Sequence, residues 1–307
     1  MSAPDLRVRI GDLELANPVM PASGTFGYGE EYAGLIDLNG LGAIVSKAVS
    51  PKPRKGNPPP RVVESKCSML NSIGLQNVGV EGFLSEKIPF LLPYSPPLIV
   101  NVVGNDLEEY REVVEALDPE PRVHGFEINL SCPNVQKGLE FGTTAEGVAR
   151  ITASLRSLTK KSLWIKLTPM VPEPAELGKA AEGEGADALV AINTLGGMAI
   201  DVEKRRPVLG AKFGGLSGPA VKSVALKYVW TLYEAVGIPV VGVGGIGNGT
   251  DALEFVMAGA TAVQVGTANF VNPRAMPDVL ARMVEWLTRR NVASIRELIG
   301  EAHGSDG

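Results

Sequence analysis

The sequence predicts an α/β protein, a (β/α)8 TIM barrel with long active-site loops over the rim where the strands end. Short β-branched runs recur along the chain, and segments with helical apolar spacing separate most of them. No glycine-rich dinucleotide fingerprint opens the first unit, which favours a closed barrel over an open sheet. The 307 residues contain no low-complexity linker, so we expect a single domain over residues 1–307.

Eight runs are predicted to be strands. Most are continuously apolar rather than alternating, as expected of parallel strands that are covered on both faces. The predicted strands are residues 18–22, 43–48, 98–103, 126–130, 163–167, 188–193, 239–243 and 262–265.

Helical patterns lie between these strands, and several begin with a capping residue or an early proline. The predicted helices are residues 106–117, 145–158, 174–184, 219–236 and 251–258. Two connections, 49–97 and 195–238, are too long for simple turns. Because each of them follows a strand, we expect both to lie over the same rim and to carry function.

The overall charge argues against a nucleic-acid partner. The chain has 29 Lys and Arg against 34 Asp and Glu, and neither a polybasic membrane anchor nor a secretion signal is present. No apolar stretch reaches the roughly 18 to 20 residues that span a bilayer. A reducing, cytoplasmic setting without membrane attachment is therefore expected. Cys67 and Cys132 lack the spacing of a metal site or a CxxC pair, and no disulfide between them is required.

Polar side chains are expected to gather on one rim, because the chemistry of a barrel lies at the carboxyl ends of its strands. That rule collects one thiol, two lysines, three amides, three hydroxyl groups and three glycines. The residues are Ser23, Lys47, Asn101, Asn129, Cys132, Lys166, Asn193, Thr194, Gly244, Gly245, Gly266 and Thr267.

The glycine pairs indicate a phosphate site. Gly244-Gly245 and Gly266-Thr267 follow the last two strands, where barrels often bind phosphate through backbone amides and a helix N-terminus. The run 214–219 is predicted to be a third amide-rich turn ahead of a helix. Either pair alone could simply make a tight turn, but together they favour a phosphorylated ligand.

Lys47 and Lys166 each end an apolar run, so we expect buried stems with ammonium groups in the barrel mouth. They could hold a carboxylate, a phosphate or a developing negative charge, or instead reach solvent or pair with a local carboxylate. Asn71, Asn129 and Asn193 offer donors and acceptors that suit a flat heterocycle.

Cys132 is the candidate for proton transfer, since the chain has only two histidines. A thiol with a pKa of about 8.5 can remove a proton from a carbon that a neighbouring carbonyl makes acidic. It could equally be a nucleophile toward an acyl or imine carbon, or a buried inert residue. The polar run after it suggests a lid, whereas Cys67 is expected to have no chemical role.

Several motifs resemble the FMN-dependent dihydroorotate dehydrogenases of class 1, most closely the class 1B catalytic subunit. The resemblance covers nearly the whole chain. It rests on Ala22-Ser23-Gly24-Thr25, Ser46-Lys47, Gly56-Asn57-Pro58-Pro59-Pro60-Arg61, Asn71-Ser72-Ile73-Gly74-Leu75-Gln76-Asn77, Asn129-Leu130-Ser131-Cys132-Pro133-Asn134, Asn193-Thr194, Arg205-Arg206-Pro207 and Gly215-Leu216-Ser217-Gly218-Pro219. The segment after Asn71 and the Arg-Arg-Pro run resemble the NAD-linked branch. Cys67-Ser68 and Val78 depart from the family pattern, but neither belongs to the expected chemistry.

The resemblance implies oxidation of (S)-dihydroorotate to orotate in pyrimidine (UMP) biosynthesis. Cys132 would take the C5 proton while hydride leaves C6 for flavin N5, and Lys47 would contact both flavin and substrate. Lys166 would face the flavin ring. The implied FMN site is Ser23, Lys47, Ala48, Asn101, Asn129, Lys166, Ile192, Gly218, Gly244, Gly245, Gly266 and Thr267. The implied substrate site is Lys47, Asn71, Ser72, Ile73, Gly74, Leu75, Asn129, Asn193 and Thr194, with no metal.

The resemblance also implies a homodimer that assembles with a second polypeptide, which carries FAD and an iron–sulfur cluster and reduces NAD. Three alternatives stay open. They are a fumarate-linked class 1A enzyme, a dihydropyrimidine dehydrogenase-like enzyme, and a flavin-binding module without turnover.

Overall fold

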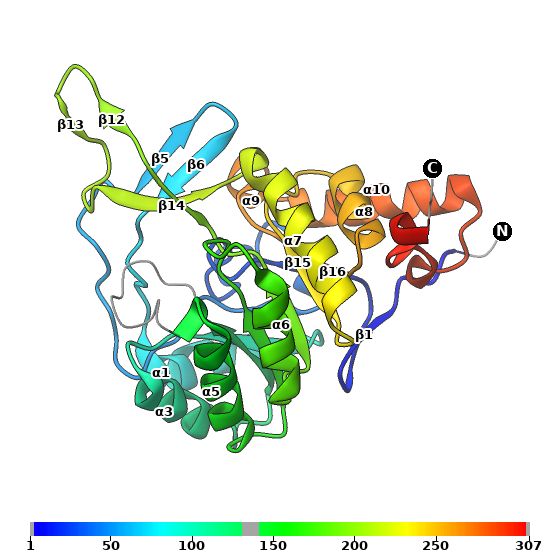
Figure 1. The fold of residues 1–307 in the computed structure, drawn as a ribbon, viewed down its shortest axis with the longest axis horizontal. Coiled ribbons are helices and arrows are strands. Elements are labelled where there is room, and N and C mark those ends of the chain that lie inside the picture. Colours follow the sequence, from blue (N-terminus) through cyan, green and yellow to red (C-terminus); the bar gives the residue numbers. More distant parts are fainter. Residues whose placement is uncertain (1–2, 131–140, 305–307) are drawn as a thin grey trace.

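The structure, a computed structural model, describes residues 3–130 and 141–304, and its centre is a sheet of eight parallel strands (Figure 1). The sheet order β3-β16-β15-β10-β9-β8-β7-β4 follows the sequence around a barrel. All eight predicted strands are confirmed, with ends that differ by up to three residues. They are β3 (Val19–Pro21), β4 (Ile44–Val45), β7 (Leu98–Val102), β8 (Val123–Asn129), β9 (Ser162–Lys166), β10 (Ala188–Ala191), β15 (Val240–Val243) and β16 (Ala260–Val265).

Gly42 closes the barrel between its first and second strands. Its backbone N–H donates to the carbonyl of Val19 at 2.8 Å, which joins the entrance of β4 to β3. A Cβ atom on Gly42 would lie only 2.0 Å from the carbonyl oxygen of Asn17, so a side chain would force the two backbones apart.

Gly42→Ala is therefore expected to lower the free energy of unfolding by about 3 kcal/mol, because the seam has no room for a methyl group. Gly40→Ala is the matched control, since nothing lies within 4 Å of the position of its Cβ. Urea unfolding of both variants checks the prediction, and equal midpoints for the two would contradict it.

All five predicted helices are present: α3 (Leu107–Leu117), α5 (Ala145–Arg156), α6 (Pro174–Gly183), α7 (Lys222–Ala235) and α8 (Gly249–Met257). The caps are formed as the sequence predicts, because Asp106 and Thr144 accept hydrogen bonds from backbone N–H groups in the first turns of α3 and α5. Helix α8 begins earlier than predicted because Asn248 and Asp251 form a capping box.

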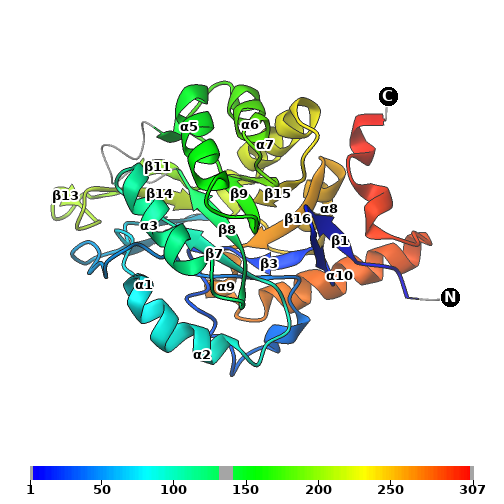
Figure 2. The same cartoon turned by 90° about the horizontal axis from the view of Figure 1, so that it is seen from below.

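Two helical regions were not predicted. The connection after β4 contains α1 (Gly79–Gly82), the π-helical turn η2 (Phe83–Lys87) and α2 (Ile88–Leu91), and α10 (Ala275–Arg290) is the long helix after β16. Figure 2 shows α1 and α2 on the outside of the barrel, on the same side as α3. The prediction that the whole of 49–97 lies over the rim is therefore wrong, because its second half is the helical layer between β4 and β7.

The remaining parts of the long connections form a four-stranded antiparallel sheet with the order β11-β14-β6-β5. We call it the rim sheet. Its strands are β5 (Val62–Ser65), β6 (Ser68–Asn71), β11 (Leu195–Met198) and β14 (Phe213–Ser217). A hairpin of β12 (Ile200–Asp201) and β13 (Arg206–Pro207) projects beyond it (Figure 1).

The predicted amide-rich turn at 214–219 is wrong, because Gly214 to Ser217 belong to strand β14. These glycines allow close strand contacts: a Cβ on Gly214 would lie 2.4 Å from the carbonyl oxygen of Asn71. Only Gly218, with φ 92°, makes the turn into the short helix η3 (Pro219–Val221).

The opposite end of the barrel carries a hairpin of β1 (Val8–Ile10) and β2 (Leu13–Leu15), whose turn at Gly11 lies against Asp187 just before β10. The short helices are η1 (Leu38–Gly40), α9 (Ala268–Val271), η4 (Ile295–Leu298) and η5 (Glu301–Gly304). Within residues 3–130 and 141–304, no helix combines the length and the apolar character needed to cross a bilayer.

Candidate active site

A cavity lies at the carboxyl ends of the barrel strands, beneath the rim sheet. Every barrel strand contributes to its lining at or just beyond its end. In strand order these residues are Ser23, Lys47, Asn101, Asn129, Lys166, Ile192, Gly244 and Gly266. The rim sheet adds Met69 and Asn71 from β6 and Gly215 to Ser217 from β14.

The cavity brings together the predicted site residues that the structure describes, with one exception. Ala48, Ile73, Gly74, Leu75, Asn193, Thr194, Gly218, Gly245 and Thr267 also line it. Ser72 is buried behind the lining, where its N–H donates to the carbonyl of Arg61 at 2.7 Å and its carbonyl accepts from Asn57 at 3.1 Å. Cys132 lies outside the described residues.

Amide side chains on one side of the cavity are held in fixed orientations. Asn193 Nδ2 donates to Asn129 Oδ1 at 3.0 Å, while Asn193 Oδ1 accepts the backbone N–H of Thr194 at 2.7 Å. Asn71 Nδ2 donates to the carbonyl of Gly215 at 3.3 Å across the rim sheet. Three amides from separate connections are thereby positioned for a planar ligand with alternating carbonyl and N–H groups.

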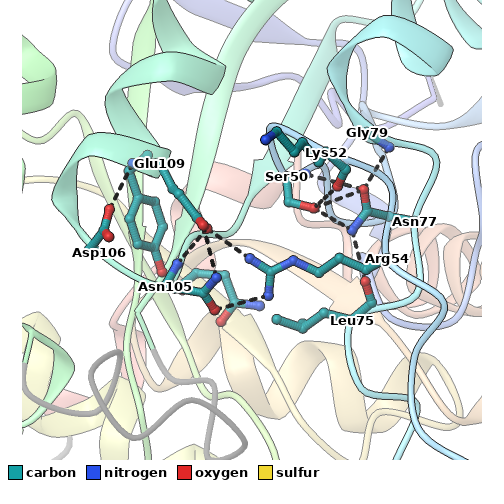
Figure 3. Close-up of polar contacts among 11 residues, drawn as sticks. Ser50, Lys52, Arg54, Leu75, Asn77, Gly79, Asn105, Asp106 and Glu109 are labelled. Carbon is teal, nitrogen blue, oxygen red and sulfur yellow. Dashed lines mark hydrogen bonds and ion pairs between the residues drawn. The ribbon is translucent and has the colours of Figure 1, made fainter.

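Arg54 braces the loop that lines this side of the cavity (Figure 3). Its guanidinium contacts Glu109 at 2.9 Å and Asn105 at 3.3 Å, at the start of α3. Its backbone pairs with Asn77, whose side chain holds Ser50, Leu75 and Gly79 (Figure 3).

The same helix holds a second part of the site, because the hydroxyl of Tyr110 donates to the carbonyl of Asn129 at 2.7 Å. Helix α3 therefore fixes the 73–75 loop and the end of β8 relative to each other. Arg54 was missed by sequence reasoning because its run, Lys52-Pro53-Arg54-Lys55, has the composition of an ordinary charged surface loop.

Lys47 is a half-buried cation that lines the cavity. Burial lowers the pKa of its ammonium group, the nearby Glu31 opposes this effect, and Arg61 adds to it. Within the part of the chain that the structure describes, its ammonium group makes no hydrogen bond or ion pair. An anionic ligand in the cavity would supply the missing partner.

Lys166 is in a different situation, because it is buried and paired with a carboxylate. Its Nζ lies 3.1 Å from Glu127 Oε1. Of the alternatives for this lysine, the structure confirms pairing with a local carboxylate. Glu127 was missed, since one acidic residue in the apolar run 126–130 gives no sign that it faces the barrel interior.

The glycine turns lie on another part of the lining. Gly244 and Gly245 have φ values of 135° and 75°, a region that L side chains rarely adopt, and Thr267 Oγ1 donates to Ser217 Oγ at 2.8 Å. A Cβ on Gly245 would lie 2.9 Å from the backbone nitrogen of Lys222. This part of the cavity presents backbone rather than side chains.

Gly245→Ala is expected to weaken retention of a phosphorylated ligand by about tenfold or more, because the turn must shift to relieve both the strain and the contact. Gly247→Ala is the matched control, since its Cβ would have only an ordinary contact at 3.6 Å with Asp251. Equilibrium dialysis of FMN against each variant measures the effect, and equal dissociation constants would refute the role of the turn.

Within the described ranges, no group of three or more His, Cys, Asp or Glu side chains is arranged to hold a metal ion. Residues 5–287 match the family model described as dihydroorotate dehydrogenase. The chain belongs to the dihydroorotate dehydrogenase family. The class 1B assignment made from the motifs is confirmed by relatives within this family.

One relative is the dihydroorotate dehydrogenase B (NAD(+)) catalytic subunit of Trichlorobacter lovleyi, 54% identical over 98% of this chain and 99% of its own length. The subunit of the same name from Geotalea daltonii is 52% identical, again over 98% of this chain and 99% of its own. The crystal structure of dihydroorotate dehydrogenase from Eimeria tenella in complex with ferulenol superposes with a TM-score of 0.82. It covers 98% of this chain and 89% of its own at 23% identity, so it supports the barrel fold alone.

Proposed function

We propose that this chain oxidises (S)-dihydroorotate to orotate in pyrimidine biosynthesis, as the FMN-containing catalytic subunit of an NAD-linked enzyme. The observation that carries the proposal is the cavity itself. Its lining contains a lysine without a partner among the described residues, three oriented amides, and glycine turns that present only backbone. The chain that carries this cavity belongs to the dihydroorotate dehydrogenase family.

Two features of the cavity fit FMN. Asn101 Oδ1 is buried and has no hydrogen-bond partner among the described residues, so it is an acceptor available to a ligand N–H. The turns at Gly244 and Gly245 line the cavity with backbone and carry no side chain, which suits backbone contacts to a phosphate. Ser23, Ala48, Asn129, Lys166, Ile192, Gly218, Gly266 and Thr267 complete the proposed FMN site.

The substrate would lie between the amides and Lys47. The ammonium group of Lys47 is proposed to bind the carboxylate of dihydroorotate, and Asn71, Asn129 and Asn193 to hold its ring carbonyl and N–H groups. Residues 73–75 and Thr194 form the proposed wall around the ring, and Ser72 supports that wall from behind. When bound, FMN supplies the acceptor for the hydride that leaves C6.

Cys132 is proposed as the base that takes the proton from C5. A thiol suffices only if the substrate is polarised, and Lys47 together with the amides can stabilise the negative charge that develops on the ring carbonyl. Loss of one proton from C5 and one hydride from C6 balances the conversion to orotate.

The relatives are named as catalytic subunits, which implies a second polypeptide in their enzymes. We propose that this chain likewise forms a homodimer in the cytoplasm and assembles with a subunit that carries FAD and an iron–sulfur cluster. That subunit would pass the two electrons to NAD.

Anaerobic spectroscopy tests the proposal. The purified chain is expected to be yellow, and dihydroorotate should bleach the flavin absorbance, whereas dihydrouracil, which lacks the carboxylate, should do so far more slowly. Equal bleaching by both would favour a dihydropyrimidine dehydrogenase-like activity, and no bleaching by either would favour a flavin-binding module. Rapid reoxidation of the lone chain by fumarate would instead favour the fumarate-linked branch.

A further inference from the structure

A buried ion pair lies below the cavity, inside the barrel. Glu127 on β8 is 0% exposed, and Lys166 at the end of β9 is 5% exposed. The Lys166 ammonium group contacts Glu127 Oε1 at 3.1 Å, Gln264 Oε1 at 3.4 Å and Ser23 Oγ at 3.5 Å. Ser23 and Lys166 line the cavity, whereas Glu127 and Gln264 lie behind them.

Both carboxylate oxygens of Glu127 accept hydrogen bonds from N–H groups. None of these nitrogen atoms can accept a hydrogen bond in return. Oε1 accepts from Asn101 Nδ2 at 2.6 Å as well as from Lys166, and Oε2 accepts from Gln264 Nε2 at 2.5 Å. A protonated carboxyl group would itself donate a hydrogen bond, but the three nitrogen atoms around Glu127 are donors and cannot accept one. The arrangement therefore fits an ionised carboxylate, which is tolerated in the interior because it is fully hydrogen-bonded.

The negative charge has two consequences for the cavity. It offsets the charge of Lys166, so that a ligand in contact with this lysine meets an ion pair rather than an isolated cation. It also orients Asn101, because the amide nitrogen must face the carboxylate and the oxygen, Oδ1, is left for another donor.

We propose that Glu127 is a positioning residue that sets the redox potential of the bound flavin, by offsetting the charge of Lys166 and by orienting Asn101. The inference rests on the proposed function, since it requires the flavin in this cavity. An isolated buried ammonium group would stabilise the extra negative charge of the reduced flavin and hold the electrons there. The carboxylate limits that stabilisation, so that the electrons can leave for the next acceptor.

Glu127→Gln removes the charge and keeps the shape of the side chain. The midpoint potential of the bound flavin should rise, so that the ratio of reduced to oxidised flavin at a fixed solution potential increases by about tenfold or more. Asp187→Asn is the matched control. It removes the same charge from an Arg156 pair near the opposite end of the barrel, and its potential should equal that of the wild type.

The double variant Glu127→Gln/Lys166→Gln separates this role from a role of Lys166 alone. It leaves no unpaired buried charge, so it can still be measured if the single variant does not fold. If Glu127 offsets Lys166, the double variant should return the ratio to within about threefold of the wild type. A double variant with a ratio at least about tenfold below the wild type would assign the potential to Lys166 alone and overturn the proposal.

Flavin content distinguishes a failure of the role proposed for Glu127 from a failure of the proposed function. Variants that bind stoichiometric flavin at an unchanged potential would overturn the role of Glu127 and leave the proposed function standing. A wild-type chain that binds no flavin would overturn the proposed function and this inference together.

Discussion

Replacing Cys132 with Ala is expected to slow the reduction of bound flavin by dihydroorotate by about a thousandfold, because a positioned base contributes roughly two to four orders of magnitude to proton removal from a carbon acid. Flavin binding should be unchanged, since Cys132 is proposed to act on substrate. Cys132→Ser should keep part of the activity and require a higher pH, because a hydroxyl group loses its proton less readily than a thiol. Anaerobic stopped-flow measurement of flavin bleaching gives the rates directly.

Cys67 provides the matched control for this experiment. It is exposed, with φ 65°, in the turn between β5 and β6 of the rim sheet. Cys67→Ser should leave the bleaching rate within about twofold of the wild type, since substitutions at exposed positions away from the site usually have small effects. If Cys132→Ala bleached as fast as Cys67→Ser, the base would have to be another residue.

Lys47→Met is expected to lower kcat/KM for dihydroorotate by roughly two to three orders of magnitude, because it removes the cation proposed to pair with the substrate carboxylate in a half-buried site. The exposed Lys52, five residues later, is the control, and Lys52→Met should have wild-type kinetics. Steady-state assays with dihydroorotate and with dihydrouracil check the cause. If Lys47 recognises the carboxylate, the variant should lose most of the preference for dihydroorotate, and an unchanged preference would contradict that role.

The lowered pKa of Lys47 predicts how the affinity for orotate depends on pH. Burial lowers the pKa of this ammonium group from its ordinary value of 10.5, and only the protonated form can pair with an anion. The dissociation constant of orotate should therefore be flat at neutral pH and rise about tenfold per pH unit above the lowered pKa. Because the pKa is lowered, the rise should begin at a lower pH than an ordinary lysine would give. Titrations of the Lys47→Met variant should show no such rise, and a wild-type affinity with the same pH dependence as that of this variant would exclude the effect.

The barrel could be predicted from local patterns because most of its strands are short, largely apolar runs between turn signals. The segment 79–91 was missed because Gly79, Gly82 and Pro89 interrupt its apolar spacing, and a π-helical turn at η2 shifts the period. Gly214 to Ser217 were assigned to a turn on composition alone. Their strand conformation depends on pairing with Asn71, a partner far away in the sequence.

The site residues likewise divide into those that local sequence patterns indicate and those that depend on contacts between distant residues. Lys47, Asn129, Asn193 and the glycine turns could be predicted because they lie at or just after barrel strands, and a barrel places all strand ends on one rim. Asn71 was expected there because its long connection follows a strand. Glu127 and Arg54 could not, because their roles depend on contacts with Lys166 and Glu109 that only the folded chain creates. Their sequence neighbours give no indication of those partners.

The rim sheet links assembly of the catalytic site to completion of the fold. Its hydrogen bond from Asn71 to Gly215 joins residues that are 144 positions apart, so the loop between them must be closed before the two strands can pair. The intervening chain contains β7, β8, β9 and β10, half of the barrel strands. A partly folded chain thus lacks the wall against which dihydroorotate is proposed to bind. Substrate binding is therefore expected to favour the complete barrel and to stabilise the native state over intermediates that lack the rim sheet.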